Sequence, residues 1–199
     1  MPETKPQTYT VFAGSRRVAT GSLTDVALAA KAAIEQMPEI TTLVFDDATG
    51  TVIDLDLRGS AAAIAARYAA LTVAEETAFS TRGRGRPKLG VIAREVTLLP
   101  RHWDWLAAQP GGASQALRRL VDEARHADGG RTERRRMQEA AYRFMAAVAG
   151  DLPGFEMAAR ALFAADQPQF SAIVATWPQD ISGYAQKLAW GEPAAAAAS

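Results

Sequence analysis

Cysteine is absent from the chain, so neither disulfides nor thiolate metal sites can form, and a reducing compartment is indicated. No stretch approaches the roughly 18 consecutive apolar residues that a transmembrane helix needs. The opening MPETKPQTYT also lacks the apolar segment typical of a secretory signal. We therefore expect a cytoplasmic protein with no membrane partner.

Recognisable catalytic patterns are missing as well. His102 and His126 are the only histidines, and neither stands at the spacing of a metal site. The stretch GRGRPKLG is neither a dinucleotide fingerprint nor a Walker A sequence. One predicted hairpin is rich in aspartate: Asp46, Asp47, Asp54 and Asp56. These carboxylates could bind a divalent cation, and the alternative is that they form a solvated strand face and turn. We expect no enzyme activity and no cofactor.

Charge is unevenly distributed along a chain whose net charge is zero. Residues 82–143 contain 14 Lys and Arg against 7 Asp and Glu, whereas the other 137 residues contain 8 against 15. A basic segment between acidic flanks is typical of a protein with a polyanionic partner. A solvated helical surface with chance arginines is the alternative.

Apolar patterning predicts an α+β fold. Residues 8–72 have the order ββαββα, which indicates a small antiparallel sheet covered on one face by helices. The strands are expected at 8–14, 16–20 and in a hairpin at 41–57, and the helices at 22–38 and 60–71. Ser22 and Asp25 resemble a capping box at the start of the first helix.

The rest of the chain is predicted to be a linker followed by helices. A strand-like stretch reaches Leu99, Pro100 opens a short helix, and a second helix runs from its expected N-cap Ser114 to Gly129. Four tryptophans at helical positions are expected in the core: Trp103, Trp105, Trp177 and Trp190. The predicted regions are a ββαββα domain (1–73), a basic linker (74–93), a strand-helix-helix unit (94–128), C-terminal helices (129–191) and a disordered tail (192–199).

Part of the basic linker resembles an AT-hook, with Arg84, Gly85, Arg86 and Pro87 as its core and Lys88 beside it. The resemblance covers only residues 82–90. A narrow A·T minor groove attracts arginines, and glycine lets the backbone lie deep in it. The resemblance implies that Arg84 and Arg86 lie along the groove while Arg82 and Lys88 meet phosphates.

Residues 94–127 resemble a ribbon-helix-helix module of the Arc/MetJ type. The shared features are a strand, a Leu-Pro step, a short helix, a turn and a longer amphipathic helix. In that family two chains pair their strands into a ribbon that lies in the major groove. The resemblance implies a homodimer, and a phosphate held by backbone N–H groups of the turn residues Gly112, Ala113 and Ser114.

Two registers stay open for such a ribbon, residues 94–99. Counting back from the Leu-Pro step turns Arg94, Val96 and Leu98 toward DNA. The alternation of the strand itself turns Val96 and Leu98 inward and Thr97 outward. Thr97 and Arg118 complete the candidate DNA contacts. The alternative is a strand-helix-helix piece packed into a larger core.

The whole chain also resembles a bacterial protein family of unknown function. We predict a homodimeric DNA-binding protein of the nucleoid, either a transcriptional regulator or a nucleoid-associated protein, whose partner is A·T-rich double-stranded DNA. One alternative is a non-enzymatic adaptor dimer whose basic surface binds an acidic protein. The other is an enzyme that uses the aspartate-rich hairpin.

Overall fold

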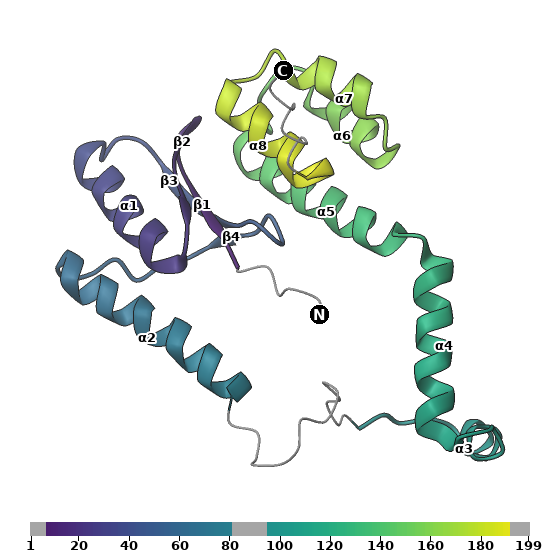
Figure 1. The fold of residues 1–199 in the computed structure, drawn as a ribbon. Helices are drawn as coiled ribbons and strands as arrows, with labels where there is room; N and C mark the ends of the chain where they lie inside the picture. The colour runs from purple at the N-terminus through teal and green to yellow at the C-terminus, as the bar shows by residue number, and fades with distance from the viewer. Residues whose placement is uncertain (1–6, 81–94, 192–199) are drawn as a thin grey trace, which may run out of the picture. The chain divides into compact units, whose positions relative to one another are not determined.

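The computed structural model describes residues 7–80 and 95–191 (Figure 1). Its contacts divide the chain into two compact units, which we call unit 1 (Met1–Phe79 with Glu133–Ser199) and unit 2 (Ser80–Thr132). The N-terminal elements and the C-terminal helices, treated as separate regions in the sequence analysis, therefore share unit 1. Unit 2 is inserted between its two segments in sequence.

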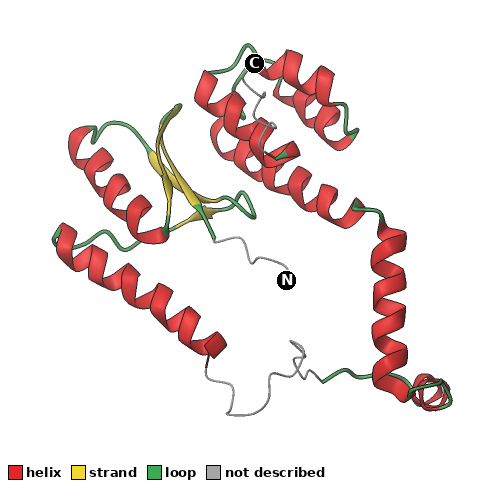
Figure 2. Cartoon of the chain, viewed as in Figure 1, coloured by secondary structure: helices red, strands yellow, loops and turns green. Residues whose placement is uncertain are grey.

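Within the described residues the chain forms four strands and eight helices, so the fold is α+β and mostly helical (Figure 2). The strands are β1 (Tyr9–Ala13), β2 (Arg16–Gly21), β3 (Thr42–Asp46) and β4 (Val52–Ile53). The helices are α1 (Leu23–Gln36), α2 (Ala61–Ser80), α3 (Pro100–Ala107), α4 (Gly112–Asp128), α5 (Arg131–Val148), α6 (Phe155–Phe163), α7 (Gln167–Val174) and α8 (Gln179–Trp190).

The sheet of unit 1 is antiparallel, with the strand order β2-β1-β3-β4. Val11 of β1 lies opposite Val44 of β3, and Phe12 lies opposite Leu43. On the edge strand β2, Val18 is an extra residue that breaks the register with β1, which is a β-bulge.

Helices cover both faces of this sheet (Figure 1). Val11 and Val44 face α1, with which they form one core cluster. Phe12 and Phe45 face α5 and α8 on the other side. The prediction of helices on one face is therefore wrong. The consecutive apolar residues of β1 and β3 are the pattern of strands buried on both sides.

The second core is aromatic. Phe12, Phe45, Phe144 and Tyr184 contact one another with ring centroids 4.6–6.0 Å apart. Such edge-on and tilted pairs stabilise by about 0.5–1.5 kcal/mol each beyond the burial of their area. This cluster joins the N-terminal sheet to the C-terminal helices.

The turn between β3 and β4 docks directly on α5. The Arg143 guanidinium donates a 2.9 Å hydrogen bond to the Thr49 carbonyl. Gly50 has a φ of +65°, and a Cβ at this position would overlap the Ala140 backbone carbonyl. Only glycine allows both this backbone conformation and this close approach.

Local signals set several helix ends. The Ser22 hydroxyl accepts from the Asp25 N–H and the Asp25 carboxylate accepts from the Ser22 N–H, which confirms the capping box. Gly129, in the left-handed conformation, is the C-cap of α4, as expected. Ser114 is not the N-cap of α4, however. The helix begins two residues earlier, at Gly112, and its N-cap is Gly111 in a left-handed conformation (φ 80°), so Ser114 already lies within the first turn.

Two elements differ in length from the prediction. Helix α2 continues to Ser80, into residues expected to be linker, because alanine and glutamate there favour a helix even without apolar periodicity. Strand β4 ends at Ile53 rather than near residue 57. Beyond it, the carbonyls of Asp56 and Arg58 accept hydrogen bonds from the Arg67 guanidinium at 2.6 and 3.3 Å. This segment is therefore bound to α2 instead of continuing the ladder.

Candidate functional site

The predicted DNA contacts fall in two groups. Seven lie outside the described residues: Arg82, Arg84, Gly85, Arg86, Pro87, Lys88 and Arg94. The other five lie together in unit 2: Thr97, Gly112, Ala113, Ser114 and Arg118. Thr97 is exposed on the segment that precedes α3, and the remaining four occupy the first two turns of α4.

The first turn of α4 has no side-chain cap. Its N-cap residue Gly111 has no side chain to offer, and the Gly112 N–H bonds the Gln109 carbonyl at 3.0 Å. Ser114 is exposed, and Arg118 stands one turn later on the same side of the helix. A helix N-terminus carries partial positive charge. These features together are compatible with contact to a phosphate.

Most arginines of unit 2 have no carboxylate partner within the described residues. Arg101, Arg118 and Arg125 are exposed and form no ion pair there. Arg131 donates to two backbone carbonyls, and Arg119 lies 3.7 Å from Glu123 on the same helix. The described part of unit 2 thus presents several arginines that are free to bind an external anion, although its Asp and Glu residues equal its arginines in number.

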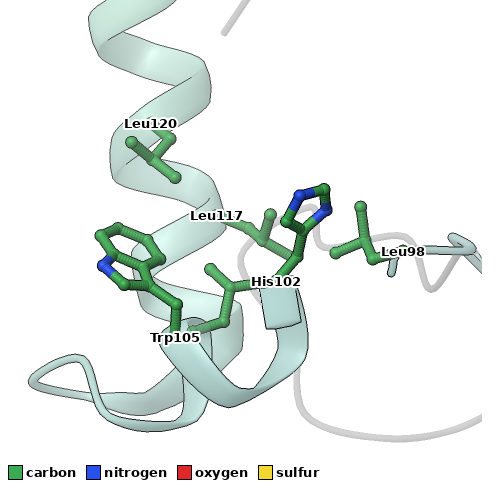
Figure 3. Close-up of a pocket in the computed structure, with 6 residues that line it drawn as sticks. Leu98, His102, Trp105, Leu117 and Leu120 are labelled. Atoms are coloured by element: carbon green, nitrogen blue, oxygen red, sulfur yellow. The ribbon is translucent and has the colours of Figure 1, made fainter. Parts of the chain in front are cut away.

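An apolar groove lies between α3, α4 and the segment before them (Figure 3). Its volume is about 250 Å³, and its lining consists of Leu98, His102, Trp105, Leu106, Leu117 and Leu120. Figure 3 shows these side chains gathered beside α4, with His102 as the polar one among them.

Unit 2 has little core of its own. Leu106 and Ala116 are its buried hydrophobic residues within the described part. Trp103 and Trp105 are 40% and 49% exposed, so the prediction that they lie in the core is wrong. The reason is that, among the described elements, α3 packs chiefly on α4, which leaves much of its surface open. For the other two tryptophans the prediction is confirmed: Trp177 is buried and donates to the Pro153 carbonyl at 2.8 Å, and Trp190 packs on Phe170.

Sequence reasoning missed a buried polar cluster in unit 1, centred on Asp47. The Asp47 carboxylate accepts hydrogen bonds from the hydroxyls of Thr8, Thr10 and Tyr184 at 3.1, 2.7 and 2.8 Å. Lys187 lies 3.7 Å away, and the Asp47 side chain is only 8% exposed. Burial raises the pKa of Tyr184, and the Asp47 carboxylate adds to this, so its hydroxyl stays a donor. No local signal marks this pairing, because Tyr184 is far away in sequence.

Asp46 and Asp56 each bind a group close to them in sequence. Asp46 accepts from the Ala48 N–H in the turn, and Asp56 binds the Arg58 guanidinium, which holds the pKa of Asp56 well below its usual range. Within the described residues no group of three or more His, Cys, Asp or Glu could hold a metal ion.

A polar pocket of about 450 Å³ lies beside Lys187, with Arg17, Val18, Ala19 and Thr20 of β2 as its other walls. Acidic groups adjoin both of its cations. Lys187 lies by Asp47, and the Arg17 backbone N–H donates to the Asp180 carboxylate at 2.9 Å. The pocket therefore has no clear excess of one charge with which to select an ionic ligand.

Comparison with known sequences places residues 8–189 in one family, described as an uncharacterized protein conserved in bacteria (DUF2239). The chain belongs to this family. The predicted resemblance to a bacterial family of unknown function is thereby confirmed. Neither a curated protein nor a solved structure matches the DUF2239 chain. Within its described residues, no helix is long and apolar enough to cross a membrane.

Proposed function

We propose that this protein binds duplex DNA through unit 2 and the basic residues that precede it, as a transcriptional regulator or a nucleoid-associated protein. The observation that carries this proposal is the set of exposed arginines without a carboxylate partner in the described part of unit 2: Arg101, Arg118 and Arg125. Arginines that pair with no internal carboxylate are available to phosphates. Phosphate contacts supply most of the sequence-independent affinity for DNA.

The hook-like stretch would add an A·T-selective contact. Arg84 and Arg86 insert into the minor groove, and Arg82 and Lys88 contact phosphates on either side. Only a short segment separates this stretch from α3. A second contact on so short a tether binds at high effective concentration, so two weak contacts together give useful affinity.

Of the ribbon-helix-helix resemblance, the proposal uses the two helices, α3 and α4. The uncapped start of α4 supports a phosphate contact at Gly112, Ala113 and Ser114. Base reading by residues 94–99 has less support. Within the described part, residues 95–99 form no strand, and Leu98 faces the apolar groove. We therefore assign α4 to the DNA backbone and sequence preference to the hook.

A titration into short fluorescent duplexes tests this function. One duplex is A·T-rich and the other G·C-rich, and each is measured at low and at moderate salt. We expect tighter binding to the A·T-rich duplex, with an affinity that falls steeply as salt rises. No binding to either duplex at low salt would refute the proposal.

A second candidate function is a non-enzymatic adaptor that binds another protein. The exposed apolar residues of unit 2 favour it, because such patches mark interaction sites. In this function the arginines recognise acidic groups on the partner. If the protein binds neither duplex at low salt, the adaptor function is favoured.

A further inference from the structure

Unit 2 leaves a large apolar surface open to solvent. We define the α3–α4 face as the groove together with the next turn of α4, which carries Val121 and Ala124. Trp105, Leu120 and Val121 on this face are 49%, 38% and 55% exposed. Helices α3 and α4, with two buried hydrophobic residues among those described, cannot supply the burial that a small folded unit needs. The α3–α4 face therefore requires a covering partner.

The exposed area is sufficient for a weak dimer. A large hydrophobic side chain has an accessible surface of about 150–250 Å², so these three expose roughly 300 Å². Two copies would bury about 600 Å² of apolar surface. Because apolar atoms form about 65% of a homodimer interface, the whole interface would be roughly 900 Å², which is the size of a weak, reversible complex.

The charge of α4 also suits a second copy. Its three arginines are balanced by three carboxylates: Arg118, Arg119, Arg125, Asp122, Glu123 and Asp128. Two α4 helices can therefore approach without net repulsion. A two-fold interface uses the same patch on both chains, so a face that is apolar and neutral overall can complement itself.

We propose that the α3–α4 face binds a second copy of this chain and forms a two-fold symmetric dimer. In this dimer the exposed Leu120 and Val121 of each copy pack against the groove of the other. The inference rests on the apolar face and does not require that the protein bind DNA.

Sedimentation velocity of the full chain over a dilution series, without DNA, tests the dimer. Wild type should be dimeric at high concentration, and Val121→Glu should raise the dissociation constant more than tenfold, because it places a charge on the interface. Met157→Glu is the matched control. Met157 is 56% exposed on a helix of unit 1, and its substitution should leave the dissociation constant unchanged. Far-UV circular dichroism checks that both variants fold.

Amide hydrogen exchange of the wild type gives a second measurement that needs no variant. Because dilution separates the two copies, the backbone amides of α4 should exchange faster at low protein concentration than at high concentration. A wild type that is monomeric at every concentration, or α4 exchange that does not depend on concentration, would overturn the inference. A dimer that binds no duplex would refute only the proposed function, and a monomer that binds duplex would refute only the dimer.

Discussion

Tyr184 on α8 donates a 2.8 Å hydrogen bond to Asp47, 137 residues earlier in the chain. Both side chains are largely buried, so the acceptor would lose a donor that water cannot easily replace. We expect Tyr184→Phe to lower the free energy of unfolding by about 1.5–3 kcal/mol, the usual range for a hydrogen bond to a charged group. Urea unfolding measures this. Tyr142→Phe is the control, since Tyr142 is 38% exposed. A loss no larger than the control's would contradict the assigned role.

The same tyrosine predicts a change of stability with pH. Burial raises the pKa of Tyr184 above its ordinary value of 10.0, and Asp47 adds to this. Above about pH 10 the unfolded chain loses this proton while the folded chain keeps it, so unfolding becomes more favourable as pH rises. The stability of wild type should fall relative to Tyr184→Phe by about 1.4 kcal/mol per pH unit there. Unfolding of both proteins at pH values on each side of 10 tests this, and parallel curves would contradict it.

Gly50 offers a test of how the hairpin docks on α5. Gly50→Ala forces a left-handed alanine and pushes its Cβ into the Ala140 carbonyl. We expect a loss of more than about 3 kcal/mol, since the left-handed conformation alone costs about 1–2 kcal/mol. Gly14→Ala is the control, because Gly14 also has a positive φ, but its Cβ would approach only the Ile40 side chain, at 3.2 Å. Equal losses in the two variants would show that the turn does not rest against α5.

The hook-like stretch is tested by substituting both of its groove-facing arginines. Arg84→Ala with Arg86→Ala should abolish the preference for A·T-rich duplexes and leave the thermal unfolding midpoint unchanged. The reason is that these side chains supply the charge that enters the narrow groove. Competition between the two duplexes measures the preference. A double variant that still prefers A·T would refute the hook.

Arg118 tests the contact between α4 and the DNA backbone. Removing one phosphate contact should weaken binding to all duplexes similarly and reduce the slope of log affinity against log salt by about 0.9. Arg118→Ala should show both effects. Arg58→Ala is the control, because Arg58 is exposed but pairs with Asp56 at 2.8 Å in unit 1. An unchanged slope for Arg118→Ala would remove α4 from the interface.

Features set by neighbouring residues could be predicted from the sequence. The capping box of Ser22 and Asp25, the end of α4 at Gly129 and the helices after residue 131 all depend on local chemistry. Long-range features could not be predicted in the same way. The second covered face of the sheet depends on Phe12 meeting Phe144, and the alternation that usually marks one-sided burial is absent from β1.

In the candidate site, too, local features could be predicted from the sequence and long-range features could not. The positions of Ser114 and Arg118 on the first turns of a helix followed from local pattern, although the N-cap is Gly111. The exposure of Trp103 and Trp105 could not be inferred, because an amphipathic stripe does not reveal whether another element covers it. The Asp47 cluster was hidden for a different reason, since its donors come from β1 and α8. The function of the hook-like stretch remains a prediction.

Unit 1 is built from an N-terminal and a C-terminal segment, so it cannot be completed until the ribosome has made nearly the whole chain. A chain leaving the ribosome completes β1 and β3 long before α5 and α8 exist, and domains otherwise tend to fold from the N-terminus. Until Phe144 and Tyr184 emerge, Phe12 and Phe45 lie on an uncovered sheet face. A chain that stops within unit 2 leaves that sheet face uncovered. Truncated products of this protein should therefore aggregate or bind chaperones rather than stay in solution as folded fragments.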